Sequence, residues 1–365
     1  MDPRSASAFM RRALRLASRA RHLTSPNPAV GAVVVRDGVV VGEGYHRGPG
    51  TAHAEVVALE AAGEAARGAT MIVTLAPCTK QGRTPPCAPA LIEAGIAEVS
   101  IGSVDPNPAE DPGSIEALRA AGIEVTAGVR AEEADELIEN FAVWITRGRP
   151  MVTAKVASTI DGRVAAGDGS SRWITGQQAR RDAHRLRAAA DAILVGVGTI
   201  IADDPALTVR ARGYDGAQPL RVVLDSSGRT PSTSKVLDGS APALVATTDK
   251  AIDDAVEQIR ATGADVLRFP SKEGRVDIEA VIASLGSRGV TDLLVEGGPA
   301  VTGELLERRL ADRCVFYVAP ALLGQLGTPS VAGLVAPTIA DARRMRITAV
   351  RRLGEDVRID LRPGD

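Results

Sequence analysis

The chain has few aromatic side chains and no long apolar run. Its 365 residues include two Trp, three Tyr and four Phe, so it offers few platforms for stacking the bases of a single-stranded nucleic acid. Lys and Arg number 43 against 45 Asp and Glu, a net charge of -2, which favours neither a polynucleotide nor an anionic membrane surface. No apolar stretch approaches the length of a bilayer-spanning helix. We therefore expect no nucleic-acid partner and no membrane association.

Cysteine is equally scarce, with three in the whole chain. This small, odd number argues against a framework of disulfides and favours a reducing compartment, so we expect a cytoplasmic protein. The length is sufficient for two domains with separate hydrophobic cores.

The first 25 residues are rich in Arg and Ser, a composition that is also typical of an organellar transit peptide. However, Phe9, Ala13 and Leu16 fall on one helical face. We interpret the segment as the first helix of a domain, covering one face of a sheet.

A candidate metal site lies in the first third of the chain. The letters H-A-E at 53–55 are followed by Cys78 and then by Cys87. One imidazole and two thiolates form a zinc site with an open fourth position, where the metal can activate a water molecule. Glu55 is close enough to His53 to move protons without binding the metal. The pattern predicts a hydrolytic deaminase, although H-A-E alone would fit an ordinary helix start.

The first 145 residues alternate between strand and helix patterns, which predicts a layered α/β domain. Asp37-Gly38 joins two strand patterns, a strong hairpin signal. Strands are expected at 30–35, 39–43, 71–75, 98–102 and 124–127, and helices at 54–67, 87–94 and 115–121. This arrangement places the metal-ligand groups at helix N-termini, where the helix dipole favours a thiolate over a thiol.

A linker is predicted at 146–150, between a first domain of residues 1–146 and a second domain of residues 150–365. Strands are expected beyond it at 151–157, 192–197, 220–224, 292–295 and 313–318. The strand at 292–295 leads into Gly297-Gly298 and a helix, a geometry that presents backbone N–H groups to a phosphate. A tight turn that merely needs glycine fits equally well. No G-x-G-x-x-G follows a strand, so a dinucleotide would need a scaffold other than the Rossmann fold.

A series of short motifs runs through both halves of the chain. The first half contains N-P-x-V-G at 27–31, G-x-G at 42–44, H-A-E at 53–55, P-C at 77–78, G-R-T-P-P-C at 82–87 and D-P-N-P at 105–108. The second half contains D-G-R at 161–163, W-I-T at 173–175, A-D-D-P-A-L-T at 202–208 and E-G-G-P at 296–299. In this order the motifs resemble those of the bifunctional riboflavin-biosynthesis deaminase/reductase family. The resemblance covers nearly the whole chain.

The resemblance implies two consecutive reactions on a small-molecule pyrimidine nucleotide. Zinc-dependent hydrolysis would deaminate 2,5-diamino-6-ribosylamino-4(3H)-pyrimidinone 5′-phosphate, and NADPH would then reduce the ribosyl chain to ribityl. The resemblance implies a cytidine-deaminase-like three-layer α/β domain followed by a dihydrofolate-reductase-like α/β domain. It also implies one zinc ion per chain, held by His53, Cys78 and Cys87, with Glu55 as the catalytic proton carrier. We further expect a homo-oligomer, with a dimer as its simplest form.

The resemblance also assigns further site residues. Cofactor contacts fall on Ser158, Trp173, Thr199, Asp203, Ser226, Gly298 and Pro299. Substrate contacts fall on Ser171, Arg187, Leu207, Arg210 and Glu296 in the second half, and on Asn27, His46, Lys80 and Arg83 in the first. For His46 a solvated loop histidine is an alternative, and His184 is interpreted as a residue of a helix surface.

Three departures from the family pattern lie near the first site. Ala76 stands where the family has Glu, Lys80 where it has His, and Pro112-Gly113-Ser114 where it has a Gly-x-Gly loop. They leave open a diverged paralogue that acts on a related aminopyrimidine, or a reductase with a weakened deaminase half. A nucleic-acid deaminase is disfavoured by the wide spacing of the two cysteines, and a purely structural zinc site has no use for Glu55.

Overall fold

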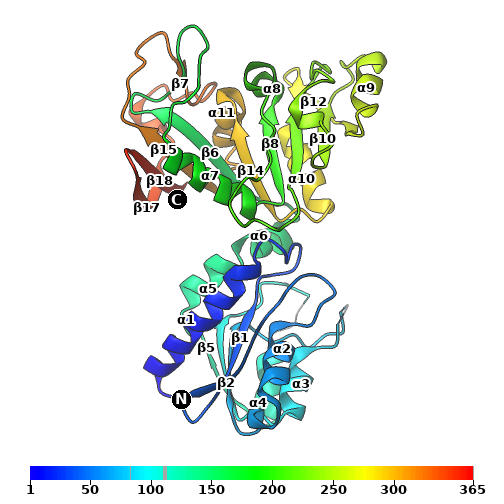
Figure 1. Ribbon diagram of the computed structural model, residues 1–365, viewed down its shortest axis with the longest axis vertical. Helices are drawn as coiled ribbons and strands as arrows, with labels where there is room; N and C mark the ends of the chain where they lie inside the picture. The colour runs from blue at the N-terminus through cyan, green and yellow to red at the C-terminus, as the bar shows by residue number, and fades with distance from the viewer. Residues whose placement is uncertain (83, 110–112, 365) are drawn as a thin grey trace. The chain divides into compact units, whose positions relative to one another are not determined.

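The computed structural model describes residues 1–82, 84–109 and 113–364 (Figure 1). The chain divides into two compact units, Met1–Gly148 and Arg149–Asp365, and each unit has its own hydrophobic core. Within the described residues, no helix combines the length and the apolar composition needed to cross a bilayer.

A five-stranded mixed sheet forms the centre of the first unit, in the order β2-β1-β3-β4-β5. Its strands are β1 (Gly31–Arg36), β2 (Val39–Tyr45), β3 (Thr70–Leu75), β4 (Glu98–Ser103) and β5 (Glu124–Ala127). β1 is antiparallel to both of its neighbours, whereas β3, β4 and β5 are parallel. Asp37 and Gly38 form the β1–β2 turn with positive φ angles of 51° and 75°, so the predicted hairpin is confirmed.

Helices cover both faces of this sheet, which gives the unit three layers (Figure 1). Helices α1 and α5 lie on one face, and α2, α3 and α4 lie on the other. The bounds are α1 (Pro3–Ala20), α2 (Ala54–Ala62), the 3₁₀ turn η1 (Gly63–Ala66), α3 (Cys87–Glu93), α4 (Gly113–Ala120), α5 (Ala131–Leu137) and α6 (Glu139–Arg147). Because α1 buries Met10, Ala13 and Ala17, the predicted N-terminal helix is confirmed as part of the domain.

Helix α2 lies very close to strand β2 because glycine occupies the strand positions beneath it. A Cβ atom at Gly44 would lie 2.6 Å from the carbonyl oxygen of Ala54, and Gly42 lies in similarly close contact with the next turn of the helix. Any side chain at these positions would push α2 outward, together with His53 and Glu55 at its start. The G-x-G motif therefore sets the depth at which α2 presents these two residues.

The second unit is built on a nine-stranded sheet in the order β11-β10-β9-β8-β14-β6-β15-β18-β17. Its strands are β6 (Met151–Thr159), β8 (Ala192–Gly196), β9 (Leu220–Leu224), β10 (Ala243–Thr247), β11 (Asp265–Arg268), β14 (Asp292–Gly297), β15 (Arg313–Ala319), β17 (Met345–Leu353) and β18 (Asp356–Pro363). The strands from β11 to β15 are parallel, and β18 and β17 extend the sheet antiparallel. Two small pairs join β7 (Arg163–Ala165) to β16 (Thr328–Pro329) and β12 (Ser271–Lys272) to β13 (Arg275–Val276).

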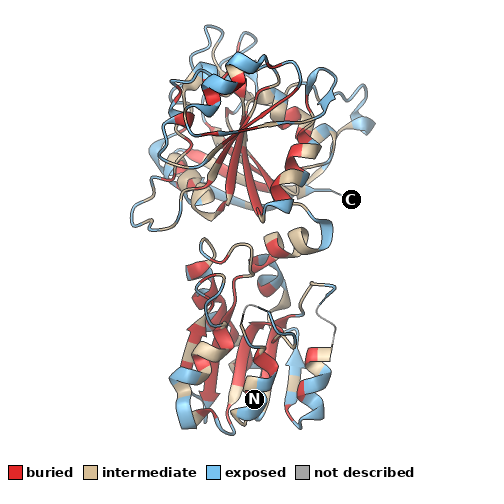
Figure 2. Cartoon of the chain, turned by 90° about the vertical axis from the view of Figure 1, so that its right-hand side faces the viewer, coloured by how far each residue is buried: buried red, intermediate tan, exposed pale blue. Residues whose placement is uncertain are grey.

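The central strands of this sheet are buried on both faces, as parallel strands flanked by helices require. On β8, Ala192 and Leu194 belong to one core cluster, whereas Ile193 and Val195 belong to another. Figure 2 shows the sheet as the most continuously buried part of the unit. The flanking elements are α7 (Gln177–Ala189), α8 (Val197–Asp203), α9 (Asp253–Arg260), α10 (Ile278–Ser287) and α11 (Pro299–Glu307), with 3₁₀ turns η2 (Lys235–Leu237) and η3 (Ile339–Asp341).

Several element boundaries differ from the sequence prediction, and two of these differences follow from a glycine with a positive φ. The helix predicted at 54–67 ends at Ala62, because Gly63 adopts a positive φ of 54° and the chain continues as a 3₁₀ turn. The linker predicted from Thr146 starts later, because α6 continues through Arg147 and ends where Gly148 adopts a left-handed φ of 66°. In the first unit, helices α5 and α6 are absent from the sequence prediction.

Candidate functional site

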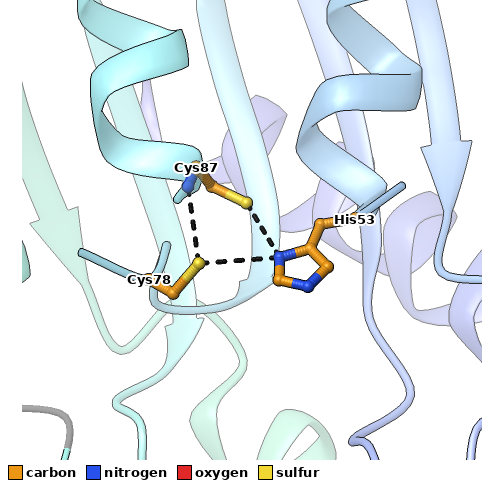
Figure 3. Close-up of side chains that lie close together, drawn as sticks. All are labelled: His53, Cys78 and Cys87. Atoms are coloured by element: carbon orange, nitrogen blue, oxygen red, sulfur yellow. Dashed lines mark hydrogen bonds between the residues drawn. The ribbon is translucent and has the colours of Figure 1, made fainter. Parts of the chain in front are cut away.

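The three predicted metal ligands converge from different segments of the first unit (Figure 3). His53 is the N-cap residue of α2, Cys87 is the first residue of α3, and Cys78 lies in the loop after β3. His53 Nδ1 lies 3.1 Å from Cys87 Sγ and 3.5 Å from Cys78 Sγ. All three candidate ligand atoms lie within 4.8 Å of one another.

This geometry fits a tetrahedral zinc ion. Zn–N and Zn–S bonds of about 2.0 and 2.3 Å place the two ligand atoms about 3.5 Å apart at a tetrahedral angle, close to both observed separations. The hydrogen bond with Cys87 lowers the pKa of Cys78, while the same contact and burial raise the pKa of Cys87. The backbone N–H of Cys87 also donates to Cys78 Sγ at 3.4 Å, which favours the thiolate that a metal requires.

Glu55 lies in the first turn of α2, next to the ligand cluster, and is 4 % exposed. Burial raises the pKa of its carboxyl to about 7. A divalent cation on the neighbouring ligands would lower that pKa again. A buried carboxyl with these opposing influences can exchange a proton near neutral pH, as a general acid/base must.

A cavity of about 370 Å³ lies beside the cluster and is lined by Glu55, His53 and Cys78. The predicted substrate residues Asn27, His46 and Lys80 line it as well.

His46 is 3 % exposed, so the alternative of a solvated loop histidine is wrong. Its Nδ1 lies 3.2 Å from the Ala52 carbonyl oxygen and its Nε2 lies 3.0 Å from Asn27 Nδ2. The amide nitrogen of Asn27 can only donate and the Ala52 carbonyl oxygen can only accept, so these partners assign a neutral ring with its proton on Nδ1. Burial, the larger cause, lowers the pKa of His46 and agrees with that assignment. Both ring nitrogens are therefore engaged by the protein itself.

Two of the three departures from the family pattern lie at this cavity. Ala76 and Lys80 line it, and Lys80 Nζ donates a hydrogen bond to the Ala109 carbonyl oxygen. Gly113 and Ser114 form the start of α4. Arg83, a predicted substrate contact, and Pro112 lie outside the described residues.

One wall of the same cavity was not identified in the sequence. Phe141, Trp144 and Ile145 line it, and all three belong to α6. Their spacing of three and four residues places them on one helical face. In a sequence, an apolar helical face that lines a cavity has the same pattern as one that packs in a core. The sequence therefore did not identify these three residues as part of a site.

The second unit contains a larger cavity, of about 1070 Å³, at the carboxyl ends of β6, β8 and β14. Ligands of open α/β sheets commonly bind at this edge. Of the predicted cofactor contacts, those that line the cavity are Trp173, Thr199, Asp203, Gly298 and Pro299. All five predicted substrate contacts of this half line it too: Ser171, Arg187, Leu207, Arg210 and Glu296.

Two predicted cofactor residues do not belong to the described lining of this cavity. Ser158 is 2 % exposed on β6, in register with Val318 of β15. The hydroxyl of Ser226 accepts a hydrogen bond from the Val276 backbone N–H at 3.0 Å. These serines lie within the sheet and its loop packing, so the structure does not bring them to the cavity surface.

A buried ion cluster forms the polar part of the larger cavity. Arg187 Nε and Nη2 donate to the two carboxylate oxygens of Glu296 at 2.5 and 2.9 Å, and Lys155 Nζ lies 3.7 Å from the same carboxylate. Burial opposes ionisation of Glu296, but the Arg187 and Lys155 charges outweigh it and hold its pKa at about 2. The carboxylate is therefore permanently ionised at neutral pH.

Lys155 and His184 were missed as site residues, although both line the cavity. Lys155 could have been recognised in the sequence, because this charged residue interrupts the largely apolar strand pattern at 151–157. His184 is not on an open helix surface. Its Nδ1 accepts a hydrogen bond from the Arg210 backbone N–H at 3.2 Å, and burial, together with Arg187 and Arg210, lowers its pKa to about 4.

The glycine turn after β14 adopts a conformation that few other residues tolerate. Gly297 and Gly298 have φ angles of 66° and 52°, and a Cβ atom at Gly298 would lie 3.2 Å from Thr199 Oγ1. The Thr199 hydroxyl donates to the Gly297 carbonyl at 3.2 Å. This contact joins the turn to α8 and leaves the turn's surface open to the cavity.

Family models match both halves of the chain. The model described as the cytidine and deoxycytidylate deaminase zinc-binding region matches residues 3–103. The model described as the RibD C-terminal domain matches residues 150–359.

Full-length relatives and solved structures agree with these matches. The chain is 43 % identical to the riboflavin biosynthesis protein RibD of Aquifex aeolicus over 96 % of both proteins. It is 40 % identical to the protein of the same name from Escherichia coli, over 97 % of this chain and 98 % of that protein. A structure of Acinetobacter baumannii RibD superposes with a TM-score of 0.91 at 36 % identity over 100 % of both chains. The diaminohydroxyphosphoribosylaminopyrimidine deaminase/5-amino-6-(5-phosphoribosylamino)uracil reductase of Thermotoga maritima superposes with a TM-score of 0.89 at 35 % identity over 99 % of both.

Proposed function

The chain belongs to the RibD family of bifunctional riboflavin-biosynthesis deaminase/reductases, and from that membership we propose how its two cavities divide the two reactions. Residues 1–146 form the deaminase and act on 2,5-diamino-6-ribosylamino-4(3H)-pyrimidinone 5′-phosphate. Residues 150–365 form the reductase and convert the ribosyl chain of the deaminated product to ribityl. The cytidine-deaminase-like and RibD-type reductase folds of the two halves agree with this division.

In the deaminase half, His53, Cys78 and Cys87 hold one zinc ion. When bound, zinc supplies a Lewis acid that activates water for attack on the ring carbon bearing the amino group. Glu55 accepts a proton from the attacking water and returns it to the departing amine. The apolar face of α6 packs against the pyrimidine ring, and Asn27, Lys80 and Arg83 contact the polar groups of the nucleotide.

In the reductase half, the larger cavity binds NADPH and the deaminated nucleotide together. NADPH supplies the hydride, because no side chain can donate one. The Gly297-Gly298 turn receives the dinucleotide phosphates, with Thr199, Asp203 and Trp173 alongside. The ionised Glu296 accepts hydrogen bonds from substrate hydroxyls.

The arginines of this cavity have different roles. Arg187 is largely engaged by Glu296 and by the Thr208 carbonyl oxygen, to which its Nη1 donates at 3.1 Å. Arg210 is exposed, with a long contact of 3.4 Å to Thr208 Oγ1. We therefore assign the substrate phosphate to Arg210, and the orientation of Glu296 to Arg187.

The observation that carries the proposal is the convergence of one imidazole, two thiols and a buried carboxyl on one cavity of a chain that also has a reductase half. The test is to incubate purified protein with the diaminopyrimidine nucleotide, with and without NADPH. Ammonia release should need no NADPH, and NADPH oxidation should begin only after deamination. Ammonia release without later NADPH oxidation would refute the reductase assignment. If the protein oxidises NADPH with chemically deaminated substrate but releases no ammonia from the diaminopyrimidine nucleotide, the deaminase assignment is refuted.

Assembly and location are proposed on separate grounds. Ile347 and Val350 are 59 % and 61 % exposed on β17, which ends the nine-stranded sheet. An exposed apolar edge strand favours self-association, so we propose a homodimer, which sedimentation equilibrium would test.

All three thiols are free, which suits a reducing compartment such as the cytoplasm, and cell fractionation would test that location.

A further inference from the structure

The two ring nitrogens of His53 face different partners. Nδ1 faces both cysteine sulfurs (Figure 3). Nε2 lies 3.0 Å from the hydroxyl oxygen of Thr84. Thr84 is half-buried and lines the 370 Å³ cavity, and neither the motif pattern nor the metal-ligand cluster assigns it a role.

This arrangement determines where the imidazole proton must lie when a metal is bound. A neutral histidine carries one proton, on the nitrogen that does not bind the metal. Since Nδ1 is the nitrogen that faces the sulfurs, Nε2 carries the proton and donates it to Thr84 Oγ1. Hydrogen bonds of this kind fix the tautomer and the ring orientation of metal-binding histidines.

We propose that Thr84 is a positioning residue for zinc, because its hydroxyl holds His53 in the tautomer and orientation that present Nδ1 to the metal. The inference rests on the proposed zinc site at His53, Cys78 and Cys87.

The backbone around Thr84 is suited to this role. Thr84 is followed by Pro85, Pro86 and Cys87, and each proline fixes its own φ near -65° and restricts the residue before it. Pro86 caps α3 with φ of -69°. One short, stiff segment thus carries both a metal ligand and the support for another ligand, so the two cannot move independently.

A second contact restrains the plane of the ring but not the direction of its N–H. The His46 ring lies edge-on to the His53 ring, with centroids 5.4 Å apart and planes at 85°. His46 is itself held by Asn27 and the Ala52 carbonyl. Such packing alone allows the imidazole to flip by 180° about its Cβ–Cγ bond, which would put Cδ2 in the place of Nδ1 and Cε1 in the place of Nε2. The Thr84 hydroxyl favours the observed orientation, because it can accept a hydrogen bond from Nε2 and not from the carbon that the flip would put there.

The test compares zinc retention in three variants of the full chain. Thr84→Val removes the hydroxyl with little change of shape, and Thr84→Ser keeps the hydroxyl. Thr51→Val is the matched control, because the Thr51 hydroxyl donates to the Gly48 carbonyl at 2.8 Å rather than to the ring. Each zinc-loaded protein is mixed with excess chromogenic chelator, and the rate of zinc transfer is measured without any enzyme assay.

Removing such a partner usually weakens metal affinity about 10- to 100-fold, so we expect Thr84→Val to lose zinc faster than the wild type by about the same factor. Thr84→Ser and Thr51→Val should release zinc at close to the wild-type rate. Equal release rates in wild type and folded Thr84→Val would overturn the proposal. A wild-type protein that takes up no zinc would instead refute the zinc site itself, so the two failures are distinguishable.

An NMR measurement on the wild type decides the question even if Thr84→Val does not fold. The chain has four histidines, so imidazole ¹⁵N–¹H correlation spectra of the zinc-loaded protein are tractable. His53 should show a proton on Nε2 that exchanges slowly with solvent. A proton on Nδ1, or an Nε2 proton that exchanges as fast as in free histidine, would overturn the proposal.

Discussion

Arg187 and Glu296 form a bidentate ion pair that joins helix α7 to the end of strand β14. The two N–O distances are 2.5 and 2.9 Å, and both side chains are largely buried. Pairing in this geometry orients the carboxylate as well as neutralising its charge. The polar part of the larger cavity is therefore prepared before any ligand enters.

The pair should make stability depend on acid pH. The folded-state pKa of Glu296 is about 2, against an ordinary value of 4.5. The ionised group therefore stabilises the fold above pH 4.5, and this contribution is lost as the pH falls towards 2. Glu296→Gln should lower the urea midpoint of unfolding at pH 7 and flatten its pH dependence between those values. The exposed Glu355→Gln is the control, and a variant with the wild-type pH profile would contradict the assignment.

Glu55 should be needed for chemistry and not for metal binding. Glu55→Gln keeps the size of the side chain but cannot carry a proton, so ammonia release should fall by at least about a hundredfold, the lower range of general acid/base effects. Zinc content, measured by elemental analysis, should stay near one per chain. Cys87→Ser should lose the metal, whereas Cys314→Ala, which removes the remaining thiol, should keep it. Loss of zinc from Glu55→Gln would show that Glu55 binds the metal, contrary to this prediction.

The two reactions should be separable by mutation, since the two units have separate cores. Cys78→Ser should abolish deamination and still reduce the deaminated nucleotide with NADPH at close to the wild-type rate. The measurement is NADPH absorbance with pre-deaminated substrate. If a folded Cys78→Ser protein fails to oxidise NADPH, the two sites act as one catalytic unit.

The cofactor should depend on the glycine turn after β14. In Gly298→Val, an L side chain would have to adopt φ of 52° and would crowd Thr199, so calorimetric affinity for NADPH should fall sharply. Gly239→Val is matched to it, because Gly239 also has a positive φ, of 76°, but lies in open space and does not line the cavity. Its affinity should remain at the wild-type value. Unchanged affinity in Gly298→Val would move the cofactor site elsewhere.

Tryptophan fluorescence should report the two sites separately. The chain has two tryptophans, and Trp144 lines the smaller cavity while Trp173 lines the larger one. In Trp173→Phe, the diaminopyrimidine nucleotide should quench the remaining emission and NADPH should not. In Trp144→Phe, NADPH should quench it. Quenching of Trp144 by NADPH alone would show that the ligands were assigned to the wrong cavities.

The metal ligands were predictable because their chemistry is encoded in residue type and spacing. A histidine and two cysteines in the pattern of His53, Cys78 and Cys87 have few roles other than metal binding. Gly38 and Gly298 mark turns whose φ angles few other residues adopt. Local signals of this kind predict elements and ligand sets well.

Residues whose role depends on distant partners were not predictable in the same way. Trp144 and His184 occupy helices, and only the packing of those helices determines whether they face a cavity or a core. The same holds for Thr84, whose hydroxyl gains its importance from His53, far away in the sequence. Ser158 and Ser226 show the same dependence on packing, since a motif match does not determine whether a side chain lines a cavity.

The close contact between α2 and the glycines of β2 has an evolutionary consequence. The catalytic geometry of the first unit depends on atoms that are absent at Gly42 and Gly44, so these positions should tolerate substitution as poorly as the metal ligands themselves. A library of random variants, selected for loss of ammonia release with NADPH oxidation retained, should therefore be enriched at these two glycines. Positions on the outer, solvent-facing side of α2 should accumulate changes freely, so that the tolerance of the helix would differ sharply between its two faces.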